Sequence, residues 1–242
     1  MGITGWVMTG FAAVVAAMLW LTVRSGGQWR RKLDDLLLPV GFARCDDPAD
    51  HDALAPRLRM LQRRHQGRRR LLHLYRRDAG DGGYRLYVGD YRFASAGGRT
   101  SGASWLIVIL VAPGRALPPL AISAIPRAPA LLGRLARALD THLEVPGMHR
   151  IASGDPALDA HFVVRLGTGV SHSTWIQPAL ELLARSGAEP SLDAEGDTLV
   201  LGSIALQADR VRQVLDGQKL QALMHLADQL HRRLGGPAAP QP

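Results

Sequence analysis

An apolar run of 21 residues, 3–23, contains no charged side chain. A helix needs about 20 apolar residues to cross the hydrocarbon core of a bilayer, so this run predicts one transmembrane helix. It is longer than the hydrophobic region of a cleaved signal peptide and no Lys or Arg precedes it, so we expect the mature protein to keep it. The basic residues that follow, Arg24, Arg30, Arg31 and Lys32, favour an outside N-terminus and a cytoplasmic bulk of the chain.

Small residues recur every four positions within this run. Such a row lets a second helix approach closely, so it predicts packing against a membrane-protein partner or a second copy; chance in an Ala-rich helix is the alternative. The row consists of Gly5, Thr9, Ala13 and Ala17. Tryptophans favour the headgroup zone at the two ends of a span. The expected membrane-interface residues are therefore Trp6, Trp20, Arg24, Trp29, Arg30, Arg31 and Lys32.

Residues 24–41 form the expected juxtamembrane linker. Within it Trp29, Leu33 and Leu37 share one face of a helix, with basic residues beside them. Two interpretations remain open. The helix lies in the membrane interface as an amphipathic element, or its apolar face docks on the domain that follows.

The rest of the chain alternates between strand and helix patterns. Apolar residues in alternation, or in a short β-branched run, predict strands, whereas a spacing of three to four predicts helices. The expected strands are 71–77, 84–93, 105–112, 120–125 and 161–166, with a hairpin near 191–202. One expected helix begins at Pro48 or nearer Ala53. The other expected helices cover 128–139, 178–185 and 208–234. Strand 120–125 carries prolines on both sides, which keep it short or at a sheet edge.

These elements predict an α+β fold with a mostly antiparallel sheet and flanking helices. We divide the chain into a transmembrane helix (1–23), a linker (24–41), a first α+β unit (42–150), a second unit packed on it (151–236) and a disordered tail (237–242).

Lys and Arg exceed Asp and Glu by eight, and the excess lies near the anchor: 14 of the 29 basic residues but 6 of the 21 acidic residues precede Asp78. Basic groups close to an anionic leaflet gain about 1 kcal/mol each, so we expect contact with anionic headgroups. Nucleic-acid binding is less favoured, because Tyr75 is the one aromatic residue besides histidine in 57–77. The basic surface candidates are Arg57, Arg63, Arg64, Arg68, Arg69 and Arg70.

No catalytic, metal or cofactor motif of useful specificity is present. The acidic segment 45–52 suits a helix start better than a metal site. Residues 167–173 could hold an anion at a helix start, although a capped loop explains them better. Asp155 and Asp159 are more typical of a turn than of a catalytic pair. We therefore assign no catalytic, cofactor-binding or metal-ligating residue.

A short motif consists of Gly154, Asp155, Pro156, Leu158, Asp159, Phe162 and Val164, followed by Gln177 and Pro178 at a helix start. Together with the basic-flanked span, YRLYVGDYRF and LPPLAI, it resembles uncharacterised bacterial membrane-anchored proteins of unknown-function families over residues 70–234. Those proteins carry Phe and Thr where this chain has Leu158 and Gln177. The resemblance implies a similar α+β cytoplasmic domain and assigns no catalytic residue.

These patterns together favour a single-pass protein of the bacterial inner membrane. We expect its cytoplasmic domain to act by interaction, as an accessory or scaffold subunit of a membrane complex. One alternative is a membrane-tethered enzyme that acts on an anionic or lipid-linked substrate, which the arginines would clamp. Nucleic-acid binding through the Arg-rich segment is the other.

Overall fold

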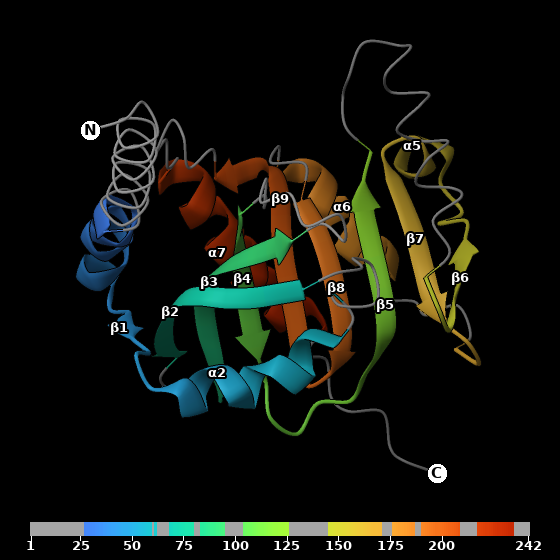
Figure 1. Ribbon diagram of the computed structural model, residues 1–242. Helices are drawn as coiled ribbons and strands as arrows, with labels where there is room; N and C mark the ends of the chain where they lie inside the picture. The colour runs from blue at the N-terminus through green and yellow to red at the C-terminus, as the bar shows by residue number, and fades with distance from the viewer. Residues whose placement is uncertain are drawn as a thin grey trace, which may run out of the picture.

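A computed structural model shows an α+β fold built on one antiparallel sheet (Figure 1). The structure describes residues 27–59, 61, 68–79, 83–94, 104–125, 145–170, 176–186, 190–208 and 217–234. The helical elements are a helix over residues 27–37, η1 (Leu38–Val40), α2 (Pro48–Leu54), η2 (Ala55–Leu58), α5 (Pro156–Asp159), α6 (Ile176–Arg185) and α7 (Gly217–Leu234). The strands are β1 (Ala43–Arg44), β2 (Arg68–Ala79), β3 (Tyr84–Ala94), β4 (Ser104–Val111), β5 (Leu117–Ala124), β6 (Met148–Ile151), β7 (Phe162–Gly167), β8 (Pro190–Gly196) and β9 (Thr198–Ala208).

The nine strands follow the order β1-β2-β3-β4-β9-β8-β5-β7-β6, and each neighbouring pair is antiparallel. This confirms the α+β class and the antiparallel sheet. The β8–β9 hairpin lies between β4 and β5, which are consecutive along the chain. Strands from both expected units therefore lie side by side in one continuous sheet.

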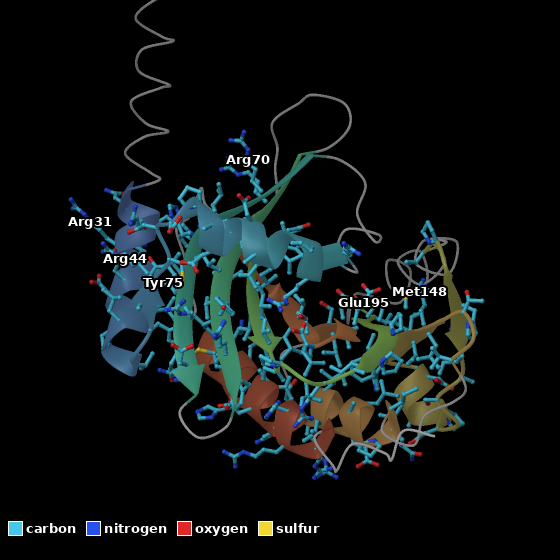
Figure 2. All side chains as sticks on the ribbon, turned by 90° about the horizontal axis from the view of Figure 1, so that it is seen from below. Arg31, Arg44, Arg70, Tyr75, Met148 and Glu195 are labelled. Carbon is cyan, nitrogen blue, oxygen red and sulfur yellow. The ribbon has the colours of Figure 1, made fainter. Side chains whose placement is uncertain are left out.

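Apolar side chains cover both faces of the sheet because the strands alternate. On β3, Leu86 and Val88 join the core beneath helix 27–37, α6 and α7. Tyr87 and Tyr91 point to the other face and pack against α2 and η2. In Figure 2 the sheet lies between α2 on one face and α6 and α7 on the other, and helix 27–37 stands at its edge. Strand β4 is buried on both faces, as its uninterrupted apolar run predicts.

Strand β5 corrects one expectation. It pairs with β8 on one side and β7 on the other, so it is an interior strand and not an edge. Pro118 and Pro119 are tolerated because they lie in the irregular stretch between Leu117 and Leu120, before the pairing with β7 begins. A proline within the paired part would remove a ladder hydrogen bond.

Helix α2 begins at Pro48, the first of the two predicted starts. Asp47 is its cap and accepts a hydrogen bond from the amide of Ala49 at 2.9 Å. The α-helix ends at Leu54 because Pro56 cannot continue it, and η2 carries the chain on. Leu54, Leu58 and Leu61 are buried, as their spacing predicts.

Several predicted features lie outside the described residues. They are the apolar span 3–23 with its small residues Gly5, Thr9, Ala13 and Ala17; Trp6, Trp20 and Arg24; Arg63 and Arg64; the helix 128–139; and the first turns of the last predicted helix. Among the helices that the structure describes, none is long and apolar enough to cross a bilayer.

Candidate functional site

Polar side chains join helix 27–37 to strands β1 and β2, close in the sequence to the predicted anchor. Helix 27–37 buries one face in the main core, where Trp29 is 1% exposed and Leu33 and Leu37 are 0% exposed. The apolar face of this helix therefore docks on the domain, which decides between the two interpretations that the pattern left open. The burial of Trp29 also corrects its assignment to the membrane interface, because a ring inside the core cannot lie among headgroups.

A buried carboxylate fastens this helix to the edge of the sheet. Asp34, 8% exposed, accepts hydrogen bonds from Arg44 on β1, with Nε to Oδ1 at 2.6 Å and a terminal guanidinium nitrogen to Oδ2 at 2.5 Å. It also accepts the hydroxyl of Tyr75 on β2 at 2.8 Å. A two-pronged arginine–carboxylate pair is directional as well as strong, so it orients the helix against the sheet. We call Asp34, Arg44 and Tyr75 the junction cluster.

Electrostatics stabilises the charged form of this cluster. Burial alone would raise the pKa of Asp34, but hydrogen bonds from Arg44 and Tyr75 outweigh burial and hold that pKa below its ordinary value. Burial raises the pKa of Tyr75, and its hydrogen bond to Asp34 raises that pKa further. Tyr75 therefore remains a neutral donor at physiological pH.

Two further contacts strengthen the junction. Arg30 pairs with Asp46 at 2.7 Å, which joins the helix to the segment after β1. The guanidinium of Arg77 on β2 lies over the ring of Phe42, 4.9 Å from its centre. Arg31 and Lys32 stay exposed on the outer face of the helix.

The predicted basic surface is only partly present in the described residues. Arg70 is exposed, and Figure 2 shows it on the same side of the molecule as Arg31, the side at which helix 27–37 begins. Arg57 is turned to the β8–β9 turn instead, where it binds Asp197 with a shortest distance of 2.9 Å. Strand β2 begins at Arg68 and includes Arg69.

The acidic segment 45–52 has structural roles. Asp46 pairs with Arg30, and Asp47 caps α2. A carboxylate oxygen of Asp50 lies 3.7 Å from a guanidinium nitrogen of Arg76, and Nε2 of His51 lies 3.2 Å from the carbonyl oxygen of Cys45. Within the described part of the chain, no group of three or more His, Cys, Asp or Glu converges as metal ligands would.

Asp155 and Asp159 also hold local structure. Asp155 caps α5 by accepting the amide of Ala157 at 2.8 Å. Asp159 accepts the amide of Ser153 at 2.9 Å. Of the predicted anion loop, Gly169 takes a positive φ of 84° and Thr168 donates its hydroxyl to the carbonyl of Gly147. Residues 171–173 lie outside the described part.

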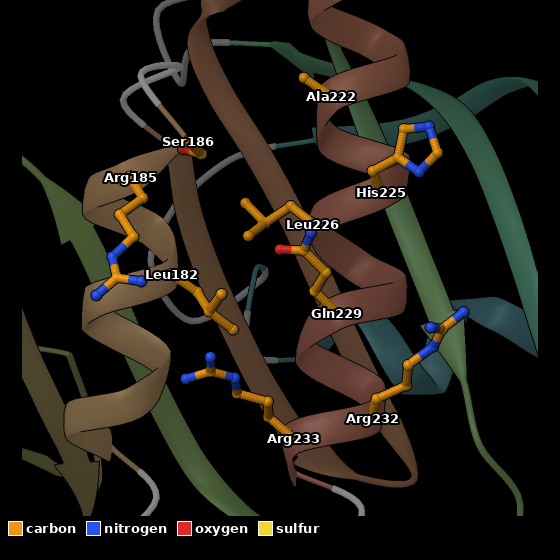
Figure 3. Close-up of a pocket in the computed structure, with 9 residues that line it drawn as sticks. All are labelled: Leu182, Arg185, Ser186, Ala222, His225, Leu226, Gln229, Arg232 and Arg233. Atoms are coloured by element: carbon orange, nitrogen blue, oxygen red, sulfur yellow. The ribbon is translucent and has the colours of Figure 1, made fainter.

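A second site was not expected from the sequence. Helices α6 and α7 border a groove with a volume of about 720 Å³, which we call the α6–α7 groove (Figure 3). Its lining residues are Leu182, Arg185, Ser186, Ala222, His225, Leu226, Gln229, Arg232 and Arg233. The available signal was the arginines in the last turns of both helices, but these also suit the helix dipole and so did not stand out.

Comparison of the chain with protein-family models, with curated proteins and with solved structures finds no match.

Proposed function

We propose that this protein is a single-pass membrane protein whose domain acts by interaction, as an accessory or scaffold subunit of a membrane complex. The observation that carries the proposal is the junction: helix 27–37, which is buried against the domain core, follows the apolar span 3–23 closely in the sequence. A helix that is buried in the core and fastened through Asp34 would keep the domain close to the span. The domain would then be held at the membrane in one orientation.

Charge supports this orientation. Arg31, Lys32 and Arg70 are exposed, and Figure 2 places Arg31 and Arg70 on the side at which helix 27–37 begins. An anionic leaflet on that side would attract these groups. A nearby bilayer therefore complements the surface that surrounds the junction, and α6 and α7 face away from it (Figure 2).

The enzyme alternative receives less support. A substrate clamp built from the arginines of 57–77 needs several of them in one pocket together with a convergent acid or base. Arg57, Arg76 and Arg77 instead lie near Asp197, Asp50 and Asp228 respectively.

The test purifies the full-length protein from native membranes in mild detergent. We expect it to stay with the membrane fraction through high-salt and carbonate washes, and to elute as a complex larger than the 26.2 kDa chain. A deletion of residues 1–23 should release it from the membrane. Recovery of monomer alone from wild-type membranes, or an external location of a reporter fused to the C-terminus, would contradict the proposal.

A further inference from the structure

The α6–α7 groove has an apolar floor and basic sides. Leu182 and Leu226, 9% and 4% exposed, form the floor. Figure 3 shows Arg233 of α7 extending toward α6, whereas Arg185 runs along α6 itself; both residues line the groove. The two helices run in opposite directions, because Ser186 lies near Ala222 and the arginines of α7 lie at the other end (Figure 3).

The positive charge of the groove has little compensation. Among the described residues that line the groove, none is a carboxylate. Arg185 has a neighbour one helical turn away, Glu181, but the two groups are 3.8 Å apart and largely exposed, so this pair is weak. Arg232 and Arg233 make no ion pair within the described residues. The carboxylate of α7, Asp228, accepts the hydroxyl of Tyr84 at 2.7 Å and lies 4.0 Å from Arg77.

The helix dipole explains part of this arrangement. Basic residues in the last turn stabilise any helix, and Arg185, Arg232 and Arg233 all occupy last turns. The dipole does not explain why the last turns of two antiparallel helices both contribute an arginine, Arg185 and Arg233, to the lining of one groove above an apolar floor. Several positive charges along one groove favour an anionic ligand there.

We propose that the α6–α7 groove binds an acidic, amphipathic helical segment of a partner protein. This inference deepens the proposed interaction function and rests on it. Leucine-type side chains of the segment would pack on Leu182 and Leu226, and its carboxylates would pair with Arg185 and Arg233, whose forked guanidinium groups suit carboxylates. Helix α6 has ten residues, or about 15 Å, so the groove accommodates roughly three turns of a bound helix.

A lipid headgroup fits the groove less well. Figure 2 places α6 and α7 on the side of the molecule opposite Arg31 and Arg70, away from the end at which helix 27–37 begins. A single phosphate would also leave the apolar floor uncovered, whereas an amphipathic helix covers the floor and neutralises the sides together.

The test places a photo-crosslinking amino acid at Ala222, an exposed residue that lines the groove, in full-length protein in living cells. The matched control carries it at Ala157, which is exposed on α5. Mass spectrometry then identifies the segment joined to each position. The same experiment is repeated on Arg185→Glu/Arg233→Glu, with Arg150→Glu, a single charge reversal on β6, as the control outside the groove. Thermal unfolding of each variant confirms that it is folded.

We expect an adduct at Ala222 and not at Ala157, on a segment with more Asp and Glu than Lys and Arg and with apolar residues at helical spacing. The double reversal should lower its yield at least about fivefold, and Arg150→Glu should not. No adduct, an adduct with lipid, a segment without acidic excess, or equal yields from both arginine variants would each overturn the inference. A complex that still co-purifies in those cases would leave the proposed function standing, whereas monomeric wild-type protein removes both.

Discussion

At the scale of single residues, the junction depends on one carboxylate. Asp34 bonds to side chains from two strands, and a bond of this kind to a charged group contributes about 1.5–3 kcal/mol when both partners are buried. Arg44 is 42% exposed in its side chain, so solvent screens its part of the interaction. Tyr75, which is 1% exposed, loses its carboxylate partner inside the core when Asp34 is changed.

Asp34→Asn should lower the free energy of unfolding by about 1–3 kcal/mol, because it removes the charge that Arg44 and Tyr75 stabilise. Asp35→Asn, at the exposed neighbouring position, should change it by less than about 0.5 kcal/mol. Urea unfolding of the detergent-solubilised chain measures both. An equal loss in the two variants would show that Asp34 has no special role.

The same carboxylate predicts a pH dependence. The pKa of Asp34 is lower in the folded than in the unfolded state. The stabilisation that its carboxylate contributes is therefore fully present above the pKa of an aspartate in the unfolded chain, about 3.9. It disappears as the pH falls through the lower folded-state pKa. The stability difference between wild type and Asp34→Asn should therefore stay constant from pH 7 to about pH 5 and shrink below pH 4. A difference that grows on acidification would contradict this assignment.

The single cysteine gives another prediction at this scale. Cys45 is 5% exposed, and burial, followed by the nearby Asp50, raises the pKa of its thiol to about 11. Thiolate is the reactive form, so the folded protein should react with a thiol reagent at pH 7.5 far more slowly than the urea-unfolded chain. Comparable rates in the two states would mean that Cys45 is accessible in the native protein.

At the scale of elements, a close contact between two strands limits which residue can occupy the end of one of them. Gly167 closes β7 directly against β5, and an added Cβ there would lie 2.9 Å from the Cβ of Pro119. The ring of Pro119 is fixed to its own backbone, so it cannot move aside to make room for a side chain at position 167. The contact also explains how the proline-rich start of β5 stays within the interior of the sheet.

Gly167→Ala should lower the free energy of unfolding by about 1–3 kcal/mol, the cost of overpacking a rigid contact. Gly27→Ala is the matched control, because nothing lies within 4 Å of its added Cβ and alanine favours helix. Thermal unfolding in detergent measures both changes. The explanation fails if Gly167→Ala melts with the wild type or if Gly27→Ala melts as low as Gly167→Ala.

At the scale of the whole molecule, the first helix connects the predicted anchor to the layer that carries the groove. An added Cβ at Gly217, the first residue of α7, would lie 2.8 Å from a methyl group of Leu36, so helix 27–37 and α7 are in close contact. Leu33 and Leu37 lie in the same core as Leu220 and Leu223 of α7. A displacement of helix 27–37 would therefore also shift α7.

Leu33→Ala should loosen the packing of helix 27–37 on the domain without releasing the protein from the membrane. The cavity it leaves costs about 2–5 kcal/mol, and amide exchange over residues 27–37 should speed up. Resistance to carbonate extraction should not change, because the span 3–23 is intact. The exposed Leu38, 42% accessible, supplies the control Leu38→Ala, for which exchange should match the wild type. Loss of membrane association in Leu33→Ala would show that the two properties are not separable.

The sequence by itself determined the elements whose signal is local. Alternation predicted β2 and β3, an uninterrupted apolar run predicted β4, and Pro48 after Asp47 was one of the two starts predicted for α2. Each depends on neighbours within a few residues along the chain. Short elements such as β1 and β6 lacked enough residues to show a period and were not predicted.

Only the tertiary structure decided what the local pattern left open. Whether Trp29 faces lipid or core depends on the sheet beside it, and the partners of Asp34 lie 10 and 41 residues away. The insertion of β8 and β9 beside β4 likewise joins distant segments, and so does the groove that Arg185 and Arg233 both line. A periodicity records which face of an element is apolar, but which surface covers that face is set by packing.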